Sequence, residues 1–151
     1  MNKKAWKIIY RWRSLSHEMS FRCCRHMFPT VDYYASVGKT VSPEIGKLFC
    51  FSNKEDAKNY LSAYYNGIRD NVKILYGTAF DISYPRIIAD SVNDFREFWE
   101  LKNKKKKITI VTKRVPKGTI CCKSFKVEEI YDIDFKLLSK DQYFGIRSYN
   151  G

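Results

Sequence analysis

Long hydrophobic runs are absent from this chain, and their absence excludes a membrane-spanning helix. Charged residues interrupt the 151-residue sequence well before any stretch reaches the roughly 20 apolar residues that a span requires. The N-terminal segment 1–10 is basic and lacks the apolar stretch and the small-residue cleavage site of a signal peptide. We therefore expect no membrane contact and a location in the cytosol of a bacterial host.

Glycine and proline are sparse, with seven and four residues respectively, and they are scattered rather than clustered. The glycine-rich loop of phosphate-binding enzymes and the glycine fingerprint of dinucleotide-binding folds are both missing. At 151 residues, 44% of them hydrophobic, the chain has the length and the composition to bury an ordinary core. We expect a single basic domain, 1–151. We expect no cofactor.

Cysteine is limited to five residues, an odd number, and four of them form the adjacent pairs Cys23–Cys24 and Cys121–Cys122. Neighbouring side chains on a strand point to opposite faces, whereas a zinc site needs ligands that converge. His26 lies two residues after Cys24, but proximity in sequence does not by itself make a nucleophile–base pair. We expect free thiols and no metal.

Acidic residues are few, because 16 Asp and Glu stand against 28 Lys and Arg, for a formal net charge of +12. Such a surface attracts polyanions. The expected partner is nucleic acid, a nucleoprotein complex such as a host defence effector, or an anionic nucleotide. The alternative is a solubilising surface without a dedicated partner. The candidate polyanion-binding residues form two clusters: Lys7, Arg11, Arg13, Arg22 and Arg25, and then Lys104, Lys105, Lys106, Lys113 and Arg114.

Aromatic residues make up 16% of the chain, and Trp6, Tyr10 and Trp12 are interleaved with the N-terminal cations. Flat rings beside cations are typical of surfaces that bind single-stranded nucleic acid. The same alternation is also that of an ordinary amphipathic strand, with rings in the core and cations in solvent. The run Lys102–Lys107 has a comparable alternative, a solvated flexible loop.

Periodicity predicts an α+β domain with a mixed or antiparallel sheet of five to six strands and two main helices. Ser52 and Glu55 have the spacing of a capping box, which predicts a helix over 53–66 that ends at Gly67. A second helix is expected to begin at Ser91 and to end in the lysine run. Strands are expected at 6–12, 48–51, 72–82 and 108–115, with one or two more in 119–135, and 136–151 is expected to be a loosely held tail.

Two groups of motifs resemble small phage and bacterial proteins of unassigned function. The first group has a Y-x-V-G-K segment followed by a proline and an L-F-x-F strand, and the second has a closing P-x-G-T strand. The matching residues of the first group are Tyr33-Tyr34, Val37 to Lys39, Pro43, Leu48 to Phe51 and Asp56-Ala57, and those of the second are Val115 to Thr119 and Ser124 to Val127. The resemblance implies a shared fold and a phage or mobile-element origin, where small accessory proteins often act on host defence systems.

A second segment resembles the strand–helix unit of ADP-ribosyltransferases, in which a glycine precedes a hydrophobic strand and then a helix with alanine and tyrosine. Here Gly46 precedes that strand. The resemblance implies an arginine–serine–glutamate triad made of Arg11, Ser52 and either Glu128 or Glu129. The chain departs from the family because it has neither the Ser-Thr-Ser motif nor the Glu-x-Glu or Gln-x-Glu motif.

The sequence therefore favours a non-enzymatic accessory protein, of phage or mobile-element type, that binds a polyanionic target. The alternative is an ADP-ribosyltransferase-like enzyme that uses NAD. The two hypotheses differ in geometry, because the enzyme requires the triad to converge on one pocket and the binding protein does not. Neither hypothesis predicts an oligomeric state.

Overall fold

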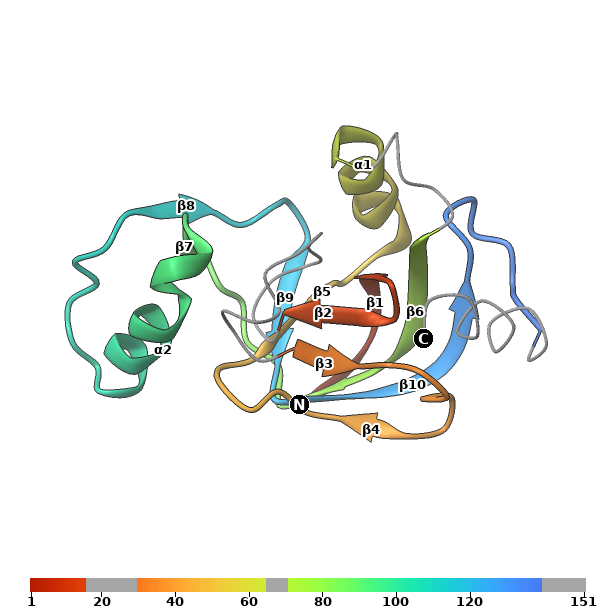
Figure 1. Ribbon diagram of the computed structural model, residues 1–151, viewed down its shortest axis with the longest axis horizontal. Helices are drawn as coiled ribbons and strands as arrows, with labels where there is room; N and C mark the ends of the chain where they lie inside the picture. The colour runs from red at the N-terminus through yellow and green to blue at the C-terminus, as the bar shows by residue number, and fades with distance from the viewer. Residues whose placement is uncertain (16–29, 65–70, 140–151) are drawn as a thin grey trace.

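A computed structural model describes residues 1–15, 30–64 and 71–139, which form a mixed α+β structure built on a large antiparallel sheet (Figure 1). The α+β prediction is confirmed, but the sheet has eight strands rather than five or six. These strands are β1 (Asn2–Tyr10), β2 (Arg13–Leu15), β3 (Thr30–Asp32), β4 (Thr40–Val41), β5 (Leu48–Phe51), β6 (Val72–Phe80), β9 (Thr119–Cys122) and β10 (Ser124–Tyr131). In these residues, no helix has the length and apolar character needed to cross a membrane.

The large sheet curls into a near-barrel around β1. Strand β1 pairs with β6 over its whole length, from Asn2↔Phe80 to Tyr10↔Val72, and it also pairs with β2 and β5. Strand β5 pairs in turn with β9, and β10 pairs with β6. Because Lys123 alone separates β9 from β10, and its N–H donates to the carbonyl of Phe80, the sheet bends back on itself.

Two buried clusters cover the two faces of this sheet. The helix face includes Ile8, Phe49 and Ile74 and packs against both helices. The opposite face includes Ile9 and Leu75 and packs against Trp12, in the loop of the β1–β2 hairpin, and against Val31 of β3. We call it the hairpin face. Successive residues of β1 alternate between the faces, as the period of two in a strand requires.

Strand β1 ends two residues earlier than predicted. Arg11 and Trp12 both have positive φ, 52° and 63°, and form the two-residue loop that joins Tyr10 to Arg13. Positive φ at both loop residues gives the twist that suits a tight hairpin. Trp12 is therefore the second loop residue rather than the end of a strand, and its ring is buried on the hairpin face.

Helix α1 (Lys54–Tyr64) lies within the predicted range, but its cap differs from the prediction. The Asn53 side chain accepts from the N–H of Asp56 at 2.8 Å and donates to the Asp56 carboxylate at 2.7 Å. The N–H of Ser52 instead donates to the carbonyl of Gly118. Asn is as good a cap as Ser, so the sequence pattern alone did not separate the two. Gly67 lies outside the described residues.

A smaller lobe projects from one side of the near-barrel (Figure 1). It contains β7 (Ile87–Ala89), the short 3-10 helix η2 (Val92–Asp94), α2 (Phe95–Asn103) and β8 (Thr112–Arg114). Strands β7 and β8 form a separate two-stranded sheet, so the predicted strand 108–115 is reduced to three residues. The second helix is confirmed, with Phe95, Phe98 and Trp99 on its buried side.

Trp99 holds the lobe against the near-barrel. Its ring meets the ring of Phe49 edge to face, with centroids 6.2 Å apart. A Cβ at Gly46 would lie 2.4 Å from the Trp99 ring, so the backbone passes directly over the indole. The lobe and the sheet therefore share one buried cluster.

The strands predicted between 119 and 135 are β9 and β10. Beyond them, the N–H of Leu138 donates to the carbonyl of Ile130, and Leu137 bridges to Tyr131. The beginning of the expected tail is thus attached to β10. Residues 140–151 lie outside the described part of the chain.

Candidate polyanion-binding site

The positive charge of the chain is concentrated in a segment that begins in the last turn of α2. Between Glu100 and Glu128 the sequence has ten Lys and Arg residues and no Asp or Glu. All ten are exposed in the structure, and we call them the basic segment: Lys102, Lys104, Lys105, Lys106, Lys107, Lys113, Arg114, Lys117, Lys123 and Lys126. The absence of intervening carboxylates leaves a continuous stretch of chain with one sign of charge.

The lysine run is held by the end of α2. The N–H of Lys106 donates to the carbonyl of Leu101, and that of Lys105 to the carbonyl of Lys102. Lys105 has a φ of 54°. This is the hydrogen-bond pattern of a Schellman motif, and cations are favoured at a helix C-terminus. The backbone of Lys104 to Lys106 is therefore ordered by the cap, unlike the flexible loop considered from the sequence.

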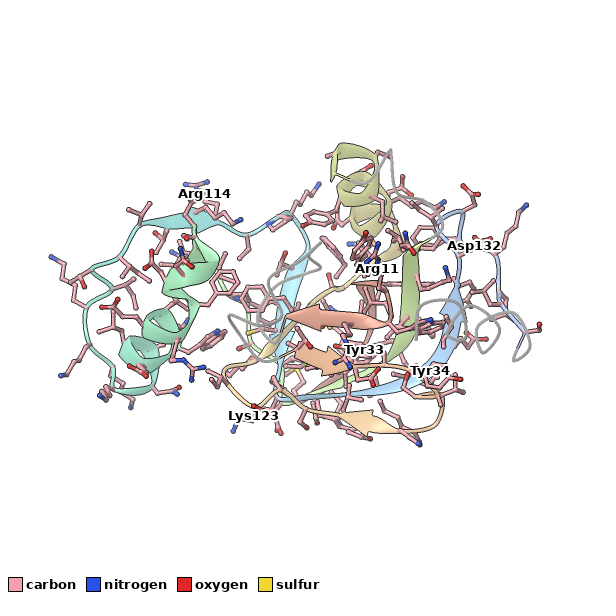
Figure 2. The ribbon with its side chains drawn as sticks, viewed as in Figure 1. Arg11, Tyr33, Tyr34, Arg114, Lys123 and Asp132 are labelled. Atoms are coloured by element: carbon pink, nitrogen blue, oxygen red, sulfur yellow. The ribbon has the colours of Figure 1, made fainter. Side chains whose placement is uncertain are left out.

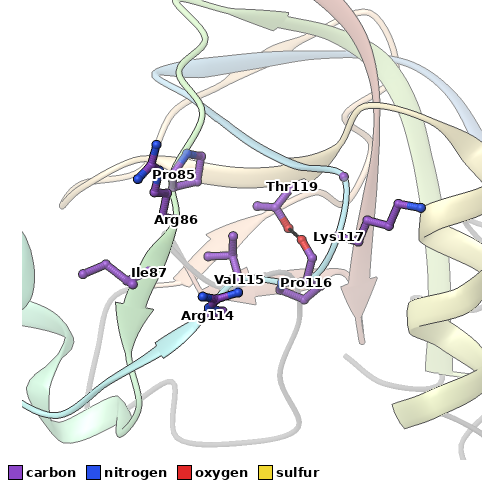
Figure 3. Close-up of a pocket in the computed structure, with 9 residues that line it drawn as sticks. Pro85, Arg86, Ile87, Arg114, Val115, Pro116, Lys117 and Thr119 are labelled. Carbon is purple, nitrogen blue, oxygen red and sulfur yellow. Dashed lines mark hydrogen bonds between the residues drawn. The ribbon is translucent and has the colours of Figure 1, made fainter.

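A surface pocket of about 560 Å³ lies where the lobe meets the near-barrel (Figure 3). Arg86, Arg114 and Lys117 supply three cations to its lining. None of the nine described lining residues is acidic. The other six are Pro85, Ile87, Val115, Pro116, Gly118 and Thr119.

Backbone pairing positions the two arginines of this pocket. Arg114 pairs with Ile87 across the β7–β8 sheet, and the N–H of Val115 donates to the carbonyl of Arg86 at 3.1 Å. The arginines therefore come from adjacent positions on two paired segments. Figure 3 shows Lys117 on the neighbouring turn, with its side chain extended toward α1.

The turn at the floor of the pocket is tightly constrained. The N–H and the hydroxyl of Thr119 both donate to the carbonyl of Pro116, and Gly118 has a φ of 82°. A Cβ at Gly118 would lie 2.1 Å from Oδ2 of Asp56, so only glycine fits. The turn is thereby locked against the first turn of α1.

Lys7 does not belong to the polyanion-binding surface, because its side chain is fully buried. Its ammonium donates to the carbonyl of Phe49 at 2.8 Å. The Trp6↔Phe51 pair places Lys7 opposite Cys50 on the hairpin face. Alternation on β1 predicts which residues share a face, but it does not show that both faces of this sheet are covered.

Lys7 changes the chemistry of the thiols around it. Burial raises the pKa of Cys50, but the hydrogen bond from Cys122 and the Lys7 ammonium outweigh burial, and the pKa is lowered. The same hydrogen bond, together with burial, raises the pKa of Cys122. Cys121 lies on the helix face and Cys122 on the hairpin face, which confirms that the adjacent cysteines diverge.

The other N-terminal cations are spread over different environments. Arg11 is exposed in the loop between β1 and β2, with its guanidinium 5.3 Å from the centre of the Tyr10 ring. Arg13 is half-buried, donates to Thr30 and lies 3.7 Å from the Asp32 carboxylate. Figure 2 shows Arg11 on the near-barrel and Arg114 on the lobe. Arg22 and Arg25 lie outside the described residues, as do His17, Cys23, Cys24 and His26.

The arginine–serine–glutamate set is not brought together. Ser52 follows Phe51, which pairs with Trp6, and β1 and β5 run antiparallel. Ser52 therefore lies level with the middle of β1, whereas Arg11 lies beyond the C-terminal end of that strand. The four residue steps from Trp6 to Tyr10 already span roughly 13 Å at 3.3 Å per residue.

The two glutamates have other partners. Glu128 accepts from the Lys4 ammonium, at 2.6 Å for Oε2, and from Thr78, and these hydrogen bonds lower its pKa. Glu129 accepts from the hydroxyl of Tyr131 at 2.8 Å. Burial and this hydrogen bond raise the pKa of Tyr131 to about 12. The Glu128 carboxylate thus links β10 to β1 and β6, whereas the hydrogen bond of Glu129 stays within β10.

Three cations of the candidate site were not expected from the sequence. Arg86, Lys123 and Lys126 stand singly rather than in runs, whereas Lys117 belongs to the second basic cluster. The absence of acidic residues between Glu100 and Glu128 was a usable signal for Lys123 and Lys126. Arg86 became visible only when pairing of β7 with β8 placed it beside the turn.

In the described part of the chain, no three His, Cys, Asp or Glu side chains are placed so that they could hold a metal ion. Comparison of the chain with protein-family models, with curated proteins and with solved structures gives no match. The candidate site therefore rests on its own geometry and charge.

Proposed function

We propose that this protein is a non-enzymatic binding protein whose target is a nucleic acid, held by the basic segment and the pocket beside it. The observation that carries the proposal is a stretch of chain with ten exposed cations and no acidic residue, two of which, Arg114 and Lys117, line a pocket together with Arg86. Phosphate contacts of this kind supply most of the affinity of nucleic-acid-binding proteins.

Arginine makes phosphate a better candidate than an acidic protein surface. The guanidinium group can hold two phosphate oxygens through parallel N–H donors. Arg86 and Arg114 line the same pocket from paired segments, so each could bind phosphate oxygens of a ligand that occupies it. The lysines that follow α2 would then attract further phosphates of the same nucleic acid, with less directional preference than arginine.

An exposed aromatic ring favours a single-stranded target. Tyr84 is 65% exposed and directly precedes Pro85 of the pocket lining. Exposed rings beside a cationic groove stack on unpaired bases, whereas paired bases are inaccessible to them. The resemblance to small phage and bacterial proteins implies that the protein would bind this nucleic acid inside a bacterial cell, alone or within a host nucleoprotein.

The proposal predicts a steep salt dependence and a local sensitivity to charge. Binding to single-stranded RNA, single-stranded DNA and duplex DNA is measured by fluorescence anisotropy over a range of salt concentrations. The triple variant K104E/K105E/K106E should weaken binding about tenfold or more and flatten the salt dependence, because fewer counterions are released.

A matched control separates a local effect from a change in net charge. The variant K3E/K39E/K136E reverses three exposed lysines outside the basic segment. It should bind more tightly than the first variant at every salt concentration. Equal loss in both variants would mean that net charge alone attracts the ligand, and a wild-type protein that binds none of the three nucleic acids at low salt would refute the proposal.

A further inference from the structure

The pocket lining has more positive charge than a phosphodiester backbone needs. Arg86, Arg114 and Lys117 are three cations around about 560 Å³ of space with no acidic lining residue. A backbone phosphodiester carries one negative charge, whereas a terminal phosphate monoester carries about −1.5 to −2 at pH 7. The charge of the lining therefore matches the end of a phosphorylated chain better than its middle.

The size of the pocket supports the same ligand. Pockets for small ligands span roughly 300–1,000 Å³, and this one lies within that range. Its apolar lining, which includes Ile87, Val115 and two prolines, is larger than inorganic phosphate requires. A nucleoside attached to the phosphate would occupy this remaining surface.

The floor of the pocket is held in place by backbone hydrogen bonds and close packing. This floor is the Pro116–Thr119 turn, closed by two hydrogen bonds to the carbonyl of Pro116 and packed against Asp56 through Gly118. Ser52 attaches the same turn to the end of β5 through the carbonyl of Gly118 at 2.9 Å. Because this floor is already held in place, its backbone does not have to be ordered when a ligand binds, which lowers the entropy cost of binding.

We propose that this pocket is a site for a nucleoside phosphate monoester, held by Arg86 and Arg114 with Lys117 at its rim. The inference rests on the proposed function for its most direct ligand, the phosphorylated end of a nucleic-acid strand. A free nucleotide carries the same group, and the experiment below distinguishes the two sources.

The test compares three single-stranded RNA oligonucleotides of the same sequence, labelled internally, with a 5′-phosphate, a 3′-phosphate or hydroxyl groups at both ends. At fixed moderate salt, one of the phosphorylated oligonucleotides should bind about tenfold more tightly than the hydroxyl form. The variant R86Q/R114Q should remove this difference. The variant K123Q/K126Q, which removes the same charge on and beside β10, should keep the difference.

In a parallel experiment, adenosine monophosphate and inorganic phosphate are titrated into the protein, and their binding is measured by calorimetry. Binding of the nucleotide that is lost in R86Q/R114Q but kept in K123Q/K126Q supports the site even if no oligonucleotide binds, and in that case it is the proposed function that fails. Equal binding of all three oligonucleotides without nucleotide binding overturns the inference and leaves nucleic-acid binding intact. A terminal-phosphate preference that persists in R86Q/R114Q also overturns it.

Discussion

At the scale of single residues, Lys7 shows how strongly burial redefines a charged side chain. It was grouped with the N-terminal cations, yet its ammonium contacts the carbonyl of Phe49 inside the protein. A buried charge is tolerated only when it is hydrogen-bonded or paired. Cys50 lies directly across from Lys7 on β5. Its pKa is lowered by the hydrogen bond from Cys122 and by the Lys7 ammonium, despite burial.

Two substitutions at Lys7 should differ in their effect on stability. We expect Lys7→Ala to lower the free energy of unfolding by about 2–4 kcal/mol, because it removes a buried side chain and leaves a cavity. Lys7→Met should lower it by at most about 1.5 kcal/mol, since the thioether refills the volume and the buried charge disappears. Urea denaturation of the two variants measures the difference.

Nucleic-acid affinity provides the control for this pair. A fully buried ammonium cannot reach a phosphate, so Lys7→Met should bind nucleic acid like the wild type at all salt concentrations. A reduced salt dependence in the folded Met variant would show that Lys7 does contribute to the binding surface.

At the scale of secondary-structure elements, α1 shows that the presence of a helix is easier to predict than its cap. The helix was expected from the capping-box spacing of Ser52 and Glu55, and its apolar side chains Ala57 and Leu61 are buried. Its first turn is capped by Asn53, one residue after the predicted Ser52. Ser52 instead joins β5 to the turn that forms the floor of the pocket.

Alanine substitutions distinguish the two candidate caps. Asn53→Ala should lower the free energy of unfolding by about 1 kcal/mol, because the N–H of Asp56 loses its acceptor. Ser52→Ala should have a smaller effect, since the contact made by Ser52 comes from its backbone N–H and survives the change. Thermal or urea unfolding of both variants would contradict the cap assignment if Ser52→Ala proved the more damaging.

At the scale of the whole molecule, the lobe and the near-barrel are joined through Trp99. The backbone at Gly46 passes over the indole ring, and Phe49 meets that ring from β5. The candidate pocket lies at this same junction, between β7–β8 and the turn before β9. Unfolding of the lobe alone would expose the shared cluster, so both parts should unfold in one transition.

Gly46→Ala tests this coupling, and Gly38→Ala is its matched control. Both glycines have positive φ, 73° and 85°, so alanine is strained at either position by about 1 kcal/mol. Only at Gly46 would the new methyl group also meet Trp99, whereas nothing lies within 4 Å at Gly38. We expect Gly46→Ala to cost about 2–4 kcal/mol in urea unfolding, with one transition seen by fluorescence and circular dichroism alike. Equal costs at the two glycines would argue against tight seating of the lobe.

The sequence by itself determined the α+β class, both helices, the strand at 48–51 and most of the strand predicted at 72–82, because these follow from local periodicity and turn chemistry. It also determined the charge imbalance, including the acid-free stretch that ends at Glu128. Only the tertiary structure decided the eight strands, the burial of Lys7, the separation of Arg11 from Ser52, and the pairing that brings Arg86 beside Arg114. These features depend on contacts between residues distant in the chain, and periodicity reports which face a side chain takes but not what covers that face.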